Sequence, residues 1–281
     1  MKFVFENEIG KINFGDDSDF KITHINGLYT PSKNYGSINY ADYDGSFTYS
    51  DNANARIITI GGDIISKDLR YHLEKASKVF NQSGFFTIDC GDKVRKIKCN
   101  QVNFSVSSRT LVSCVFTLQF LCDYPYFTDT IATKCDIHGY LGLIKNPVTF
   151  PCVLSQSSNK KDIDVKSHIK THPIFTIIVE SKGSVESGET YGYKFINNTT
   201  GKSIYLKHKS IAGEKIYIDV LKREVRSSVS GNILTKLSNY DDIENFYLAP
   251  GINKMEAVDL GEGDKARIMM EYQNYYVEAV Y

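Results

Sequence analysis

The fold is decided by a segment that begins at Arg56 and reads RIITIGGDIISKDLRYHLEKASKVFNQSGFFTIDC, and that continues as GDKVRKIKCNQVNFSVSSRTLVSCVFTLQFLCDYPYF to Phe127. Its pattern predicts a strand, a helix, a hairpin and a long strand, in that order. The β-branched residues 56–60 are typical of a strand, which we expect to end at Gly61-Gly62. The apolar residues of the last strand alternate with polar ones and share one face: Val112, Cys114, Phe116, Leu118 and Phe120.

One helix is expected between the first strand and the hairpin. Ser66 is placed to accept a hydrogen bond from a free backbone N–H of the first turn, and Gly84 to end the helix in the left-handed conformation. The apolar side chains recur with helical spacing and form one stripe: Leu69, Leu73, Ala76 and Phe80. Because a helix of about four turns is not stable alone in water, this stripe must pack on the sheet. After the helix, Gly91-Asp92 predicts the turn of a hairpin.

The composition argues against several classes of partner and compartment. Lysine plus arginine and aspartate plus glutamate number 33 each, and this zero net charge argues against nucleic acid or an anionic membrane as the main partner. The N-terminus lacks the apolar core of a signal peptide, and no apolar run reaches the length of a membrane span, so we expect synthesis in a cytoplasm. The cysteines form no CxxC pair and are expected to be free thiols: Cys90, Cys99, Cys114, Cys122, Cys135 and Cys152.

A mainly β chain of two domains is expected. The first domain comprises residues 1–135 and the second 136–281, with the crossover between them in residues 128–146. The polar stretch Tyr40–Ala55 is interpreted as a loop or an extended β-arm, and Gln156–Lys170 as a mobile loop or linker. Short strands separated by turn signals predict a β-sandwich or barrel for the second domain. The last strand, Ala266–Tyr281, is compatible with packing on either domain.

No residue is assigned a catalytic, cofactor-binding or metal-binding role. His168 and His172 have the spacing of helical zinc ligands, but no glutamate lies between them and Pro173 follows, so solvated loop histidines are the better interpretation. Asp162 and Asp164 lack the full ligand spacing of a calcium loop. Glycosidic cleavage requires two carboxyl groups at reacting distance, and the sequence does not place any two of the candidates that close together: Asp123, Asp129, Asp241, Asp242 and Glu244. A structural or binding role is therefore favoured over enzymatic turnover, and no cofactor is expected.

Two regions resemble the distal tail protein (Dit) family of tailed phages with long non-contractile tails. The first region consists of RIITIGGDI at 56–64, the helix, and the strand that ends in CDYPYF at 122–127. The second consists of Gly188-Glu189, FINNTTG at 195–201, GEKIYID at 213–219, Arg223-Glu224-Val225 and LAPGIN at 248–253. The order and spacing of these pieces over residues 20–260 carry the resemblance.

The resemblance implies a β-sandwich-like first domain with one α-helix that assembles as a hexameric ring, and a galectin-like or carbohydrate-binding-module-like (CBM-like) β-sandwich as the second domain. It implies a structural hub without enzymatic activity at the virion tail tip or baseplate of a phage or prophage, with a part in host attachment. The ring would join the tail tube protein to the tail-associated hub or lysin protein, and DNA would only pass through its channel. The stretch Tyr40–Ala55 would pair with an edge strand of a neighbouring subunit. A phage-tail-like bacteriocin would use the same subunit in the same way.

A competing hypothesis is a carbohydrate-binding or receptor-binding tail-tip module, whose partner would be a receptor-binding protein or a cell-wall glycan. Such a module would present aromatic residues on an exposed face of the second sandwich, with Tyr191, Tyr193 and Tyr205 as candidates. The same alternation is typical of core packing. A third hypothesis, a polysaccharide hydrolase, requires a carboxylate pair.

The end of the long strand carries a further expectation. Pro125 should hold Tyr124 extended and direct Tyr126 and Phe127 away from the strand. These aromatic residues would then serve either as an anchor between domains or subunits or as part of the core.

Overall fold

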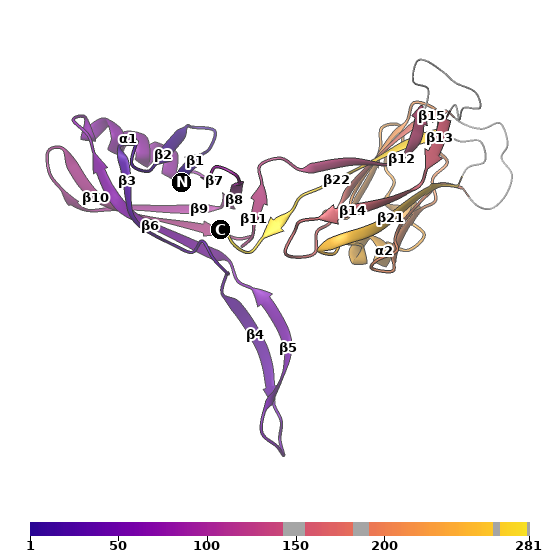
Figure 1. Ribbon diagram of the computed structural model, residues 1–281, viewed down its shortest axis with the longest axis horizontal. Coiled ribbons are helices and arrows are strands. Elements are labelled where there is room, and N and C mark those ends of the chain that lie inside the picture. The colour runs from indigo at the N-terminus through magenta and orange to yellow at the C-terminus, as the bar shows by residue number, and fades with distance from the viewer. Residues whose placement is uncertain (143–154, 182–190, 261–264, 280–281) are drawn as a thin grey trace. The chain divides into compact units, whose positions relative to one another are not determined.

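The computed structural model describes residues 1–142, 155–181, 191–260 and 265–279 (Figure 1). The protein is mainly β, as the sequence predicts. The chain forms two compact units, each with its own apolar core. The first unit contains Met1–Thr130 and Tyr276–Tyr281, and the second contains Ile131–Tyr275. The last stretch of the chain is divided, because β22 (Lys265–Tyr272) lies in a sheet of the second unit and β23 (Tyr275–Tyr276) pairs in the sheet of the first.

Ten strands of the first unit form one sheet, in the order β23-β11-β8-β7-β1-β2-β3-β6-β10-β9. β2 and β3 meet in parallel at Phe14 and Phe20, whereas β6 pairs antiparallel with both β3 and β10. The strand bounds are β1 (Lys2–Glu6), β2 (Lys11–Phe14), β3 (Phe20–Asn26), β6 (Arg56–Ile65), β7 (Gly84–Asp89), β8 (Val94–Cys99), β9 (Gln101–Arg109), β10 (Ser113–Cys122) and β11 (Phe127–Asp129).

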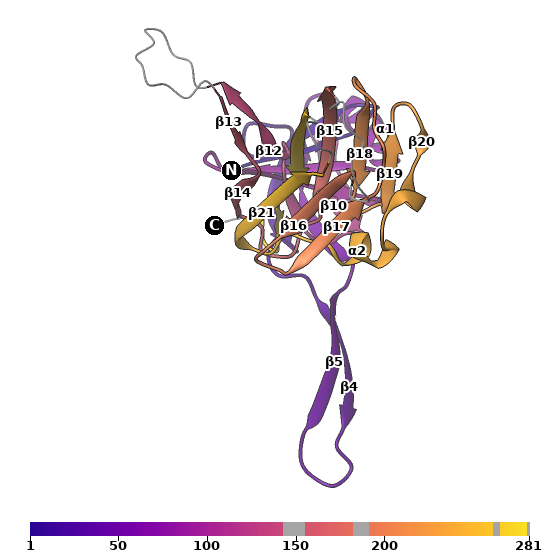
Figure 2. The ribbon, with the colours of Figure 1, turned by 90° about the vertical axis from the view of Figure 1, so that its right-hand side faces the viewer.

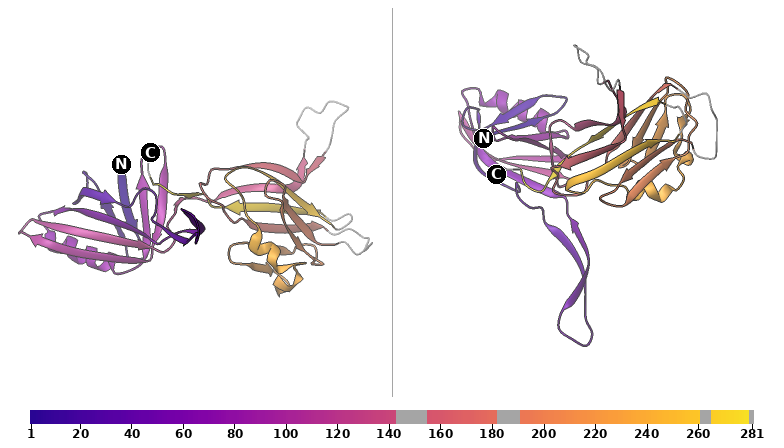
Figure 3. Two further views of the ribbon diagram at one scale, coloured as in Figure 1. Left: turned by 90° about the horizontal axis from the view of Figure 1, so that it is seen from below. Right: turned by 45° about the vertical axis from the view of Figure 1, so that its right-hand side comes forward.

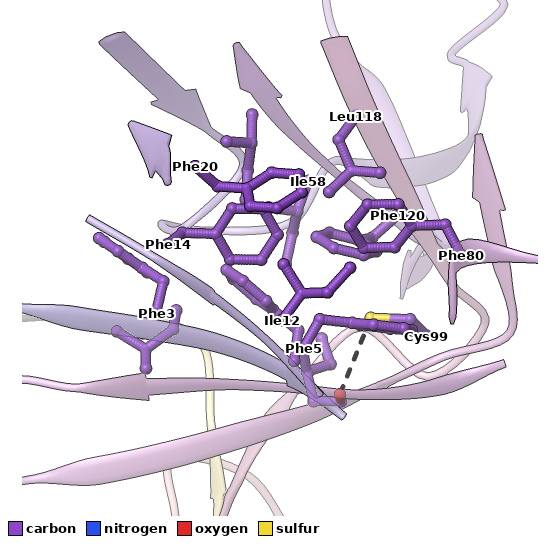
Figure 4. Packing of buried hydrophobic residues seen from close by; sticks show 14 of the residues in the cluster. Phe3, Phe5, Ile12, Phe14, Phe20, Ile58, Phe80, Cys99, Leu118 and Phe120 are labelled. Carbon is purple, nitrogen blue, oxygen red and sulfur yellow. Dashed lines mark hydrogen bonds between the residues drawn. The ribbon is translucent and has the colours of Figure 1, made fainter. Parts of the chain in front are cut away.

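The ten-stranded sheet folds over so that two of its parts pack face to face, in a sandwich-like manner (Figure 4). Phe5 in β1 stacks on Phe120 in β10 with ring centroids 5.1 Å apart, although these two strands are not neighbours. Phe80, from helix α1 (Leu69–Phe80), closes the same core with its ring centroid 5.6 Å from that of Phe5. All three side chains are buried, so the predicted packing of the helix on the sheet is confirmed.

The helix starts differently from the prediction. Asp68 is the N-cap, and its carboxylate accepts a hydrogen bond from the backbone N–H of Tyr71 at 3.3 Å. The prediction that Ser66 caps the helix is wrong, because its hydroxyl accepts from the N–H of Asp68 instead. Aspartate is as good a cap as serine, and its charge also suits the positive end of the helix dipole. The predicted apolar stripe is confirmed, with three residues buried and the last one partly buried: Leu69, Ala76, Phe80 and Leu73.

Three glycines have a role other than the predicted one. Gly84 does not end the helix in the left-handed conformation but is the first residue of β7. Gly61-Gly62 lies inside β6, which continues to Ile65, so the predicted end of that strand is wrong. Close neighbours explain the glycines, since a Cβ atom at Gly84 would lie 2.6 Å from the carbonyl oxygen of Glu6. They mark close packing within the sheet rather than its turns.

The hairpin and the long strand agree with the prediction. β7 and β8 pair antiparallel, and Gly91 turns between them with a φ of 95°. In β10 the alternating apolar residues are buried: Cys114, Phe116, Leu118 and Phe120. Val112 is exposed, because it lies in the turn before β10 starts.

A two-stranded hairpin, which we call the arm, interrupts the first unit between β3 and β6. It consists of β4 (Lys33–Asn39) and β5 (Ser46–Ala53), which pair only with each other among the described strands. Figure 1 shows the arm as a ribbon separate from the ten-stranded sheet. Of the two structures considered for Tyr40–Ala55, the β-arm is the one observed, and its first strand starts earlier, at Lys33.

The second unit is a β-sandwich, as predicted (Figures 2 and 3). One sheet has the order β13-β12-β22-β15-β18-β19-β20 and the other β14-β21-β16-β17. Phe175 and Phe195, one from each sheet, stack with centroids 4.3 Å apart. The further bounds are β12 (Thr133–Gly142), β13 (Ser155–Ser158), β14 (Lys160–Val165), β15 (Ile174–Ser181), β16 (Tyr193–Asn197), β17 (Lys202–Leu206), β18 (Lys215–Asp219), β19 (Glu224–Ser227), β20 (Gly231–Asn232), a 3-10 helix (Leu234–Lys236), α2 (Tyr240–Asn245) and β21 (Gly251–Asp259).

The prediction of a mobile loop or linker over Gln156–Lys170 is wrong. This stretch contributes most of β13 and all of β14. In β14, Ile163 and Val165 are buried while the residues between and before them face outward. β14 lies at the edge of the four-stranded sheet, where charged side chains are common because they discourage pairing with other chains. The high charge of this edge strand therefore hides its alternation.

The cysteines of the described residues are free thiols, as predicted: Cys90, Cys99, Cys114, Cys122 and Cys135. Cys152 lies outside the described residues. The sulfur atoms of Cys99 and Cys122 are 3.7 Å apart within the core of the first unit. Burial raises the pKa of the Cys99 thiol, so both groups pack as small apolar side chains.

Candidate assembly surfaces

The histidine pair singled out in the sequence lies on an irregular segment and the aspartate pair on a strand. Because His168 and His172 are not on a helix, their spacing in sequence does not place them on one helical face. His172 is half-buried, and burial lowers its pKa. Asp162 and Asp164 are exposed on β14, where Asp164 pairs with Lys166. Among the described residues no group of three or more His, Cys, Asp or Glu could hold a metal ion, and no helix is long and apolar enough to cross a membrane.

The five acidic residues considered for glycosidic cleavage are divided between the units. Asp123 and Asp129 belong to the first unit, where Asp129 accepts a hydrogen bond from the hydroxyl of Tyr276 at 3.1 Å. The other three, Asp241, Asp242 and Glu244, lie on helix α2 of the second unit. There Glu244 forms an ion pair with Arg223 at 2.6 Å. Asp129 and Glu244 are therefore engaged by a hydroxyl and a guanidinium group.

The three tyrosines considered for glycan binding do not share a surface. Tyr193 is fully buried in the second core, and its hydroxyl lies 2.6 Å from that of Ser210, so this candidate packs in the core and is not on an exposed face. Tyr191 and Tyr205 are half-buried, and the hydroxyl of Tyr205 donates to the carbonyl of Tyr191 at 3.1 Å. Two lysine ammonium groups lie over these rings, Lys209 at 5.4 Å from Tyr191 and Lys207 at 5.3 Å from Tyr205.

Arg56 ties together the segments from which the arm emerges. Its buried guanidinium lies 4.7 Å from the ring centroid of Phe127, and burial lowers its pKa to about 10. It donates to four backbone carbonyl groups, those of Gly27, Tyr29, Pro125 and Val277. Gly27 and Tyr29 precede the arm, Pro125 follows the long strand β10, and Val277 follows β23. One side chain thereby fixes the root of the arm.

Arg95 holds the returning end of the chain on the first unit. Its guanidinium lies 3.8 Å from the ring centroid of Tyr276 and donates to the backbone carbonyl of Glu278. The N–H of Ala279 donates to the carbonyl of Leu28 at 2.9 Å, next to the root of the arm. Both arginines are almost fully buried. Their charge is tolerated because carbonyl groups and aromatic rings surround it.

The aromatic residues around Pro125 divide between core and surface. Phe127 is fully buried beneath Arg56, which agrees with the core interpretation for that residue. Tyr124 is exposed, and its ring lies 5.3 Å from that of Tyr126 in an edge-to-face arrangement. The backbone carbonyl of Pro125 accepts a hydrogen bond from Arg56 Nε at 2.6 Å.

The arm exposes large apolar side chains on both strands and at its tip. Tyr43 and Phe47 expose 68% and 58% of their surface, and the remaining members are exposed to a similar or smaller degree: Tyr35, Ile38, Tyr40 and Tyr49. An isolated two-stranded hairpin is at best marginally stable in water. Contiguous exposed apolar residues usually mark a protein interface. The arm is therefore the strongest candidate for a binding surface in the first unit.

A second candidate binding surface of the first unit lies around helix α1 and strand β9, away from the root of the arm. β9 is an edge strand of the ten-stranded sheet, and the turn after it exposes Leu111 and Val112. Between α1 and β9 lies a groove of about 390 Å³, which we call the α1 groove. Its lining residues are Arg70, Leu73, Glu74, Ser77, Lys78 and Arg109.

Sequence reasoning missed the arginines that organise this unit. Arg56 reads only as the polar start of an apolar strand, and Arg95 as one of several cations in the hairpin. The only signal was a charged residue next to an aromatic or apolar run, which is common on surfaces. Their partners are backbone carbonyls from distant segments, and no side-chain pattern marks those.

No family model matches the sequence, and no curated protein matches it. Among solved structures, the chain is similar to the Dit (gp 19.1) protein of phage SPP1, described as a paradigm of the hub adsorption apparatus in phages that infect Gram-positive bacteria. That likeness covers 91% of this chain and 93% of the other at 12% sequence identity, with a TM-score of 0.66. A chain of the activated phage p2 baseplate matches over 96% of this chain and 97% of its own, at 11% identity and a TM-score of 0.45. The protein thus has the fold of a Dit-type phage tail protein.

Proposed function

We propose that this protein is a structural hub of a phage tail tip or baseplate that assembles copies of itself into a closed ring. The ring would link the tail tube protein to the tail-associated hub or lysin protein, without enzymatic turnover and with DNA only passing through its channel. The observation that carries this proposal is the shared fold with SPP1 Dit over 91% of the chain. The site of action would be the virion tail tip.

The exposed arm supports self-assembly. Each copy carries one apolar arm, and the arm pairs with no other described strand of its own chain. If the arm binds a different surface on a second copy, the contact is heterologous, and such contacts form rings when the rotation between copies closes. Exposed strands of this kind bind a partner by extending its sheet or by packing on its surface.

The test of this proposal is negative-stain imaging of the purified protein after a sizing column. We expect closed rings with a central channel, of about six copies for a hub of this class. Open filaments would contradict closure, and a field without particles larger than one chain at every concentration would contradict self-assembly. Addition of the tail tube protein should then give rings bound to tube ends.

A further inference from the structure

We infer that the tip of the arm binds the α1 groove of a second copy of this chain. The tip consists of residues 40–45. Its two aspartates would form ion pairs with the cations of the groove, and its two tyrosine rings would contact the same cations. This inference rests on the proposed function, because it names the two surfaces that would meet in the ring. It goes beyond the shared fold, since it is argued from the charges and shapes of this chain alone.

The tip of the arm is ordered before it binds anything. The rings of Tyr40 and Tyr43 stack with centroids 4.4 Å apart, and the N–H of Tyr40 donates to the carbonyl of Gly45 at 3.1 Å. Gly45 has a φ of 117°, a conformation that other residues adopt only with strain. Asp42 and Asp44 flank Tyr43 and are exposed. The tip thus has a preformed aromatic pair, one ring of which is flanked in sequence by two carboxylates, and preformed shape reduces the entropy lost on binding.

The α1 groove complements this tip in charge. Its lining has three cationic side chains, Arg70, Lys78 and Arg109, against the single carboxylate of Glu74. Glu74 is bound by Arg70, with Nε and Oε1 3.2 Å apart. Within the described ranges, neither Lys78 nor Arg109 forms an ion pair, and neither Asp42 nor Asp44 does. Two free cations on one surface therefore face two free carboxylates on the other.

The groove also offers an apolar floor for an aromatic ring. Leu73 is partly buried and packs against the core beneath the groove. Arg70 and Lys78 also line the groove, and long cationic side chains commonly add apolar surface through their aliphatic stems. Tyrosine suits such a place because its ring is apolar and its hydroxyl stays in water. The cations can also lie over the faces of the two rings.

The two surfaces lie at opposite ends of one strand, so a chain presents one to each neighbour. The arm rejoins the sheet just before Arg56, the first residue of β6, whereas α1 follows its last residue, Ile65. The ten residues of β6 separate these ends by about 33 Å. Because the arm and the groove lie at opposite ends of β6, the arm of one copy would bind the groove of the next, and this head-to-tail contact can repeat from copy to copy.

Charge reversal tests the contact in both directions. The variant D42K/D44K should weaken self-association by about tenfold or more, and so should K78E/R109E, because each sets like charges against each other. Combining the four changes in one chain should restore association to within about threefold, since the charges are again opposite. Two controls reverse charges outside the contact. D16K/D17K, in an exposed loop of the same unit, matches D42K/D44K in charge, and K75E, on α1 but outside the groove, reverses a single charge. Thermal melting of every variant checks that it is folded.

Mixing the two impaired variants gives the sharpest result. D42K/D44K retains the native groove and K78E/R109E the native arm, and the reversed arm of the first is also opposite in charge to the reversed groove of the second. The mixture should therefore assemble beyond pairs of twice 31.7 kDa in alternating order, although neither variant associates well alone. A mixture that associates no better than either variant alone, or double variants that assemble like the unchanged protein, would overturn this inference and leave the ring intact as a proposal. If the unchanged protein forms pairs or filaments that the charge reversals weaken, but no closed rings, the contact stands and only the proposed ring is overturned. Unchanged protein that stays monomeric at all concentrations would overturn both.

Discussion

The core of the first unit and its arm are both built mainly of antiparallel strands, yet the core buries its aromatic residues and the arm exposes them. In the core, Phe5 and Phe120 are fully buried and stack on each other. In the arm, Tyr43 and Phe47 are mostly exposed. The core gains its stability from contacts within one chain, whereas the arm can gain it only from a partner. Folding therefore depends on the core, whereas the proposed assembly would depend on the arm.

The largest effect is expected from Phe80→Asp, which breaks the core. Phe80 is buried, with its ring 5.2 Å from that of Phe104 as well as close to Phe5. Losing the ring and burying an unpaired carboxylate should cost about 4 kcal/mol or more of unfolding free energy. Urea unfolding of the full chain measures this. Tyr71→Asp, on the exposed side of the same helix, is the control and should change little; equal losses would contradict the placement of α1.

A smaller loss is expected from Arg56→Ala, which frees the root of the arm without touching the arm itself. The change leaves four carbonyl groups without their cationic donor, at a cost of about 3 kcal/mol. Arg226→Ala, an exposed arginine of the second unit, should stay within about 0.5 kcal/mol of the unchanged protein. Hydrogen exchange should also show loosening of the segments around Gly27 and Val277. If the two alanine variants melt alike, Arg56 does not anchor these segments.

The second unit provides a polar counterpart to the aromatic core. Glu214 is buried, lies 2.7 Å from Nε2 of His208, and accepts from the hydroxyl of Ser227 and from the N–H of Ile211. Burial alone would raise the pKa of Glu214, but these hydrogen bonds outweigh it and lower the pKa below its ordinary value. The network therefore favours the ionised carboxylate.

This network should make the second unit sensitive to acid. Because the folded pKa lies below the unfolded one, the stabilisation is fully present above the unfolded pKa of about 4.3 and is lost as the pH falls through the folded pKa. Glu214→Gln should lose about 2 kcal/mol at neutral pH. Its stability should also fall less than that of the unchanged protein between about pH 5 and pH 3. Parallel pH profiles would contradict the role of the carboxylate.

The smallest effect on folding is expected in the arm. Replacing Tyr43 and Phe47 by serine should change the unfolding free energy by no more than about 0.5 kcal/mol, because neither side chain is buried in the chain alone. Self-association should nevertheless fall. Urea unfolding and sizing chromatography of one preparation measure both effects. A large loss of stability would show that the arm belongs to the core after all.

The sequence predicts the core of both units well, because burial imposes a pattern on it. The stripe of α1 and the alternation of β10 follow directly from the spacing of Leu69, Phe80 and Phe116. β14 was missed because its charged side chains outnumber its two buried ones. The turn assignments of Gly61 and Gly84 failed because glycine also serves close packing, which depends on segments far away in sequence.

The candidate surfaces were harder to predict for the same reason. Exposed residues are not constrained by packing, so the sequence of Tyr40–Ala55 is compatible both with a loop and with a β-arm. Tyr193 could be considered for a surface or for the core because alternation does not say which face of a strand is buried, and the structure places it in the core. Arg56 gave no signal because its partners are backbone carbonyls.

The most direct test is the light-scattering mass of the unchanged protein over a range of concentrations, compared with a variant in which residues 34–52 are replaced by a short glycine-containing turn. The account predicts that the unchanged protein reaches a mass of about six chains of 31.7 kDa, while the armless variant stays at one chain and melts at the same temperature. An armless variant that assembles as well as the unchanged protein would contradict the account.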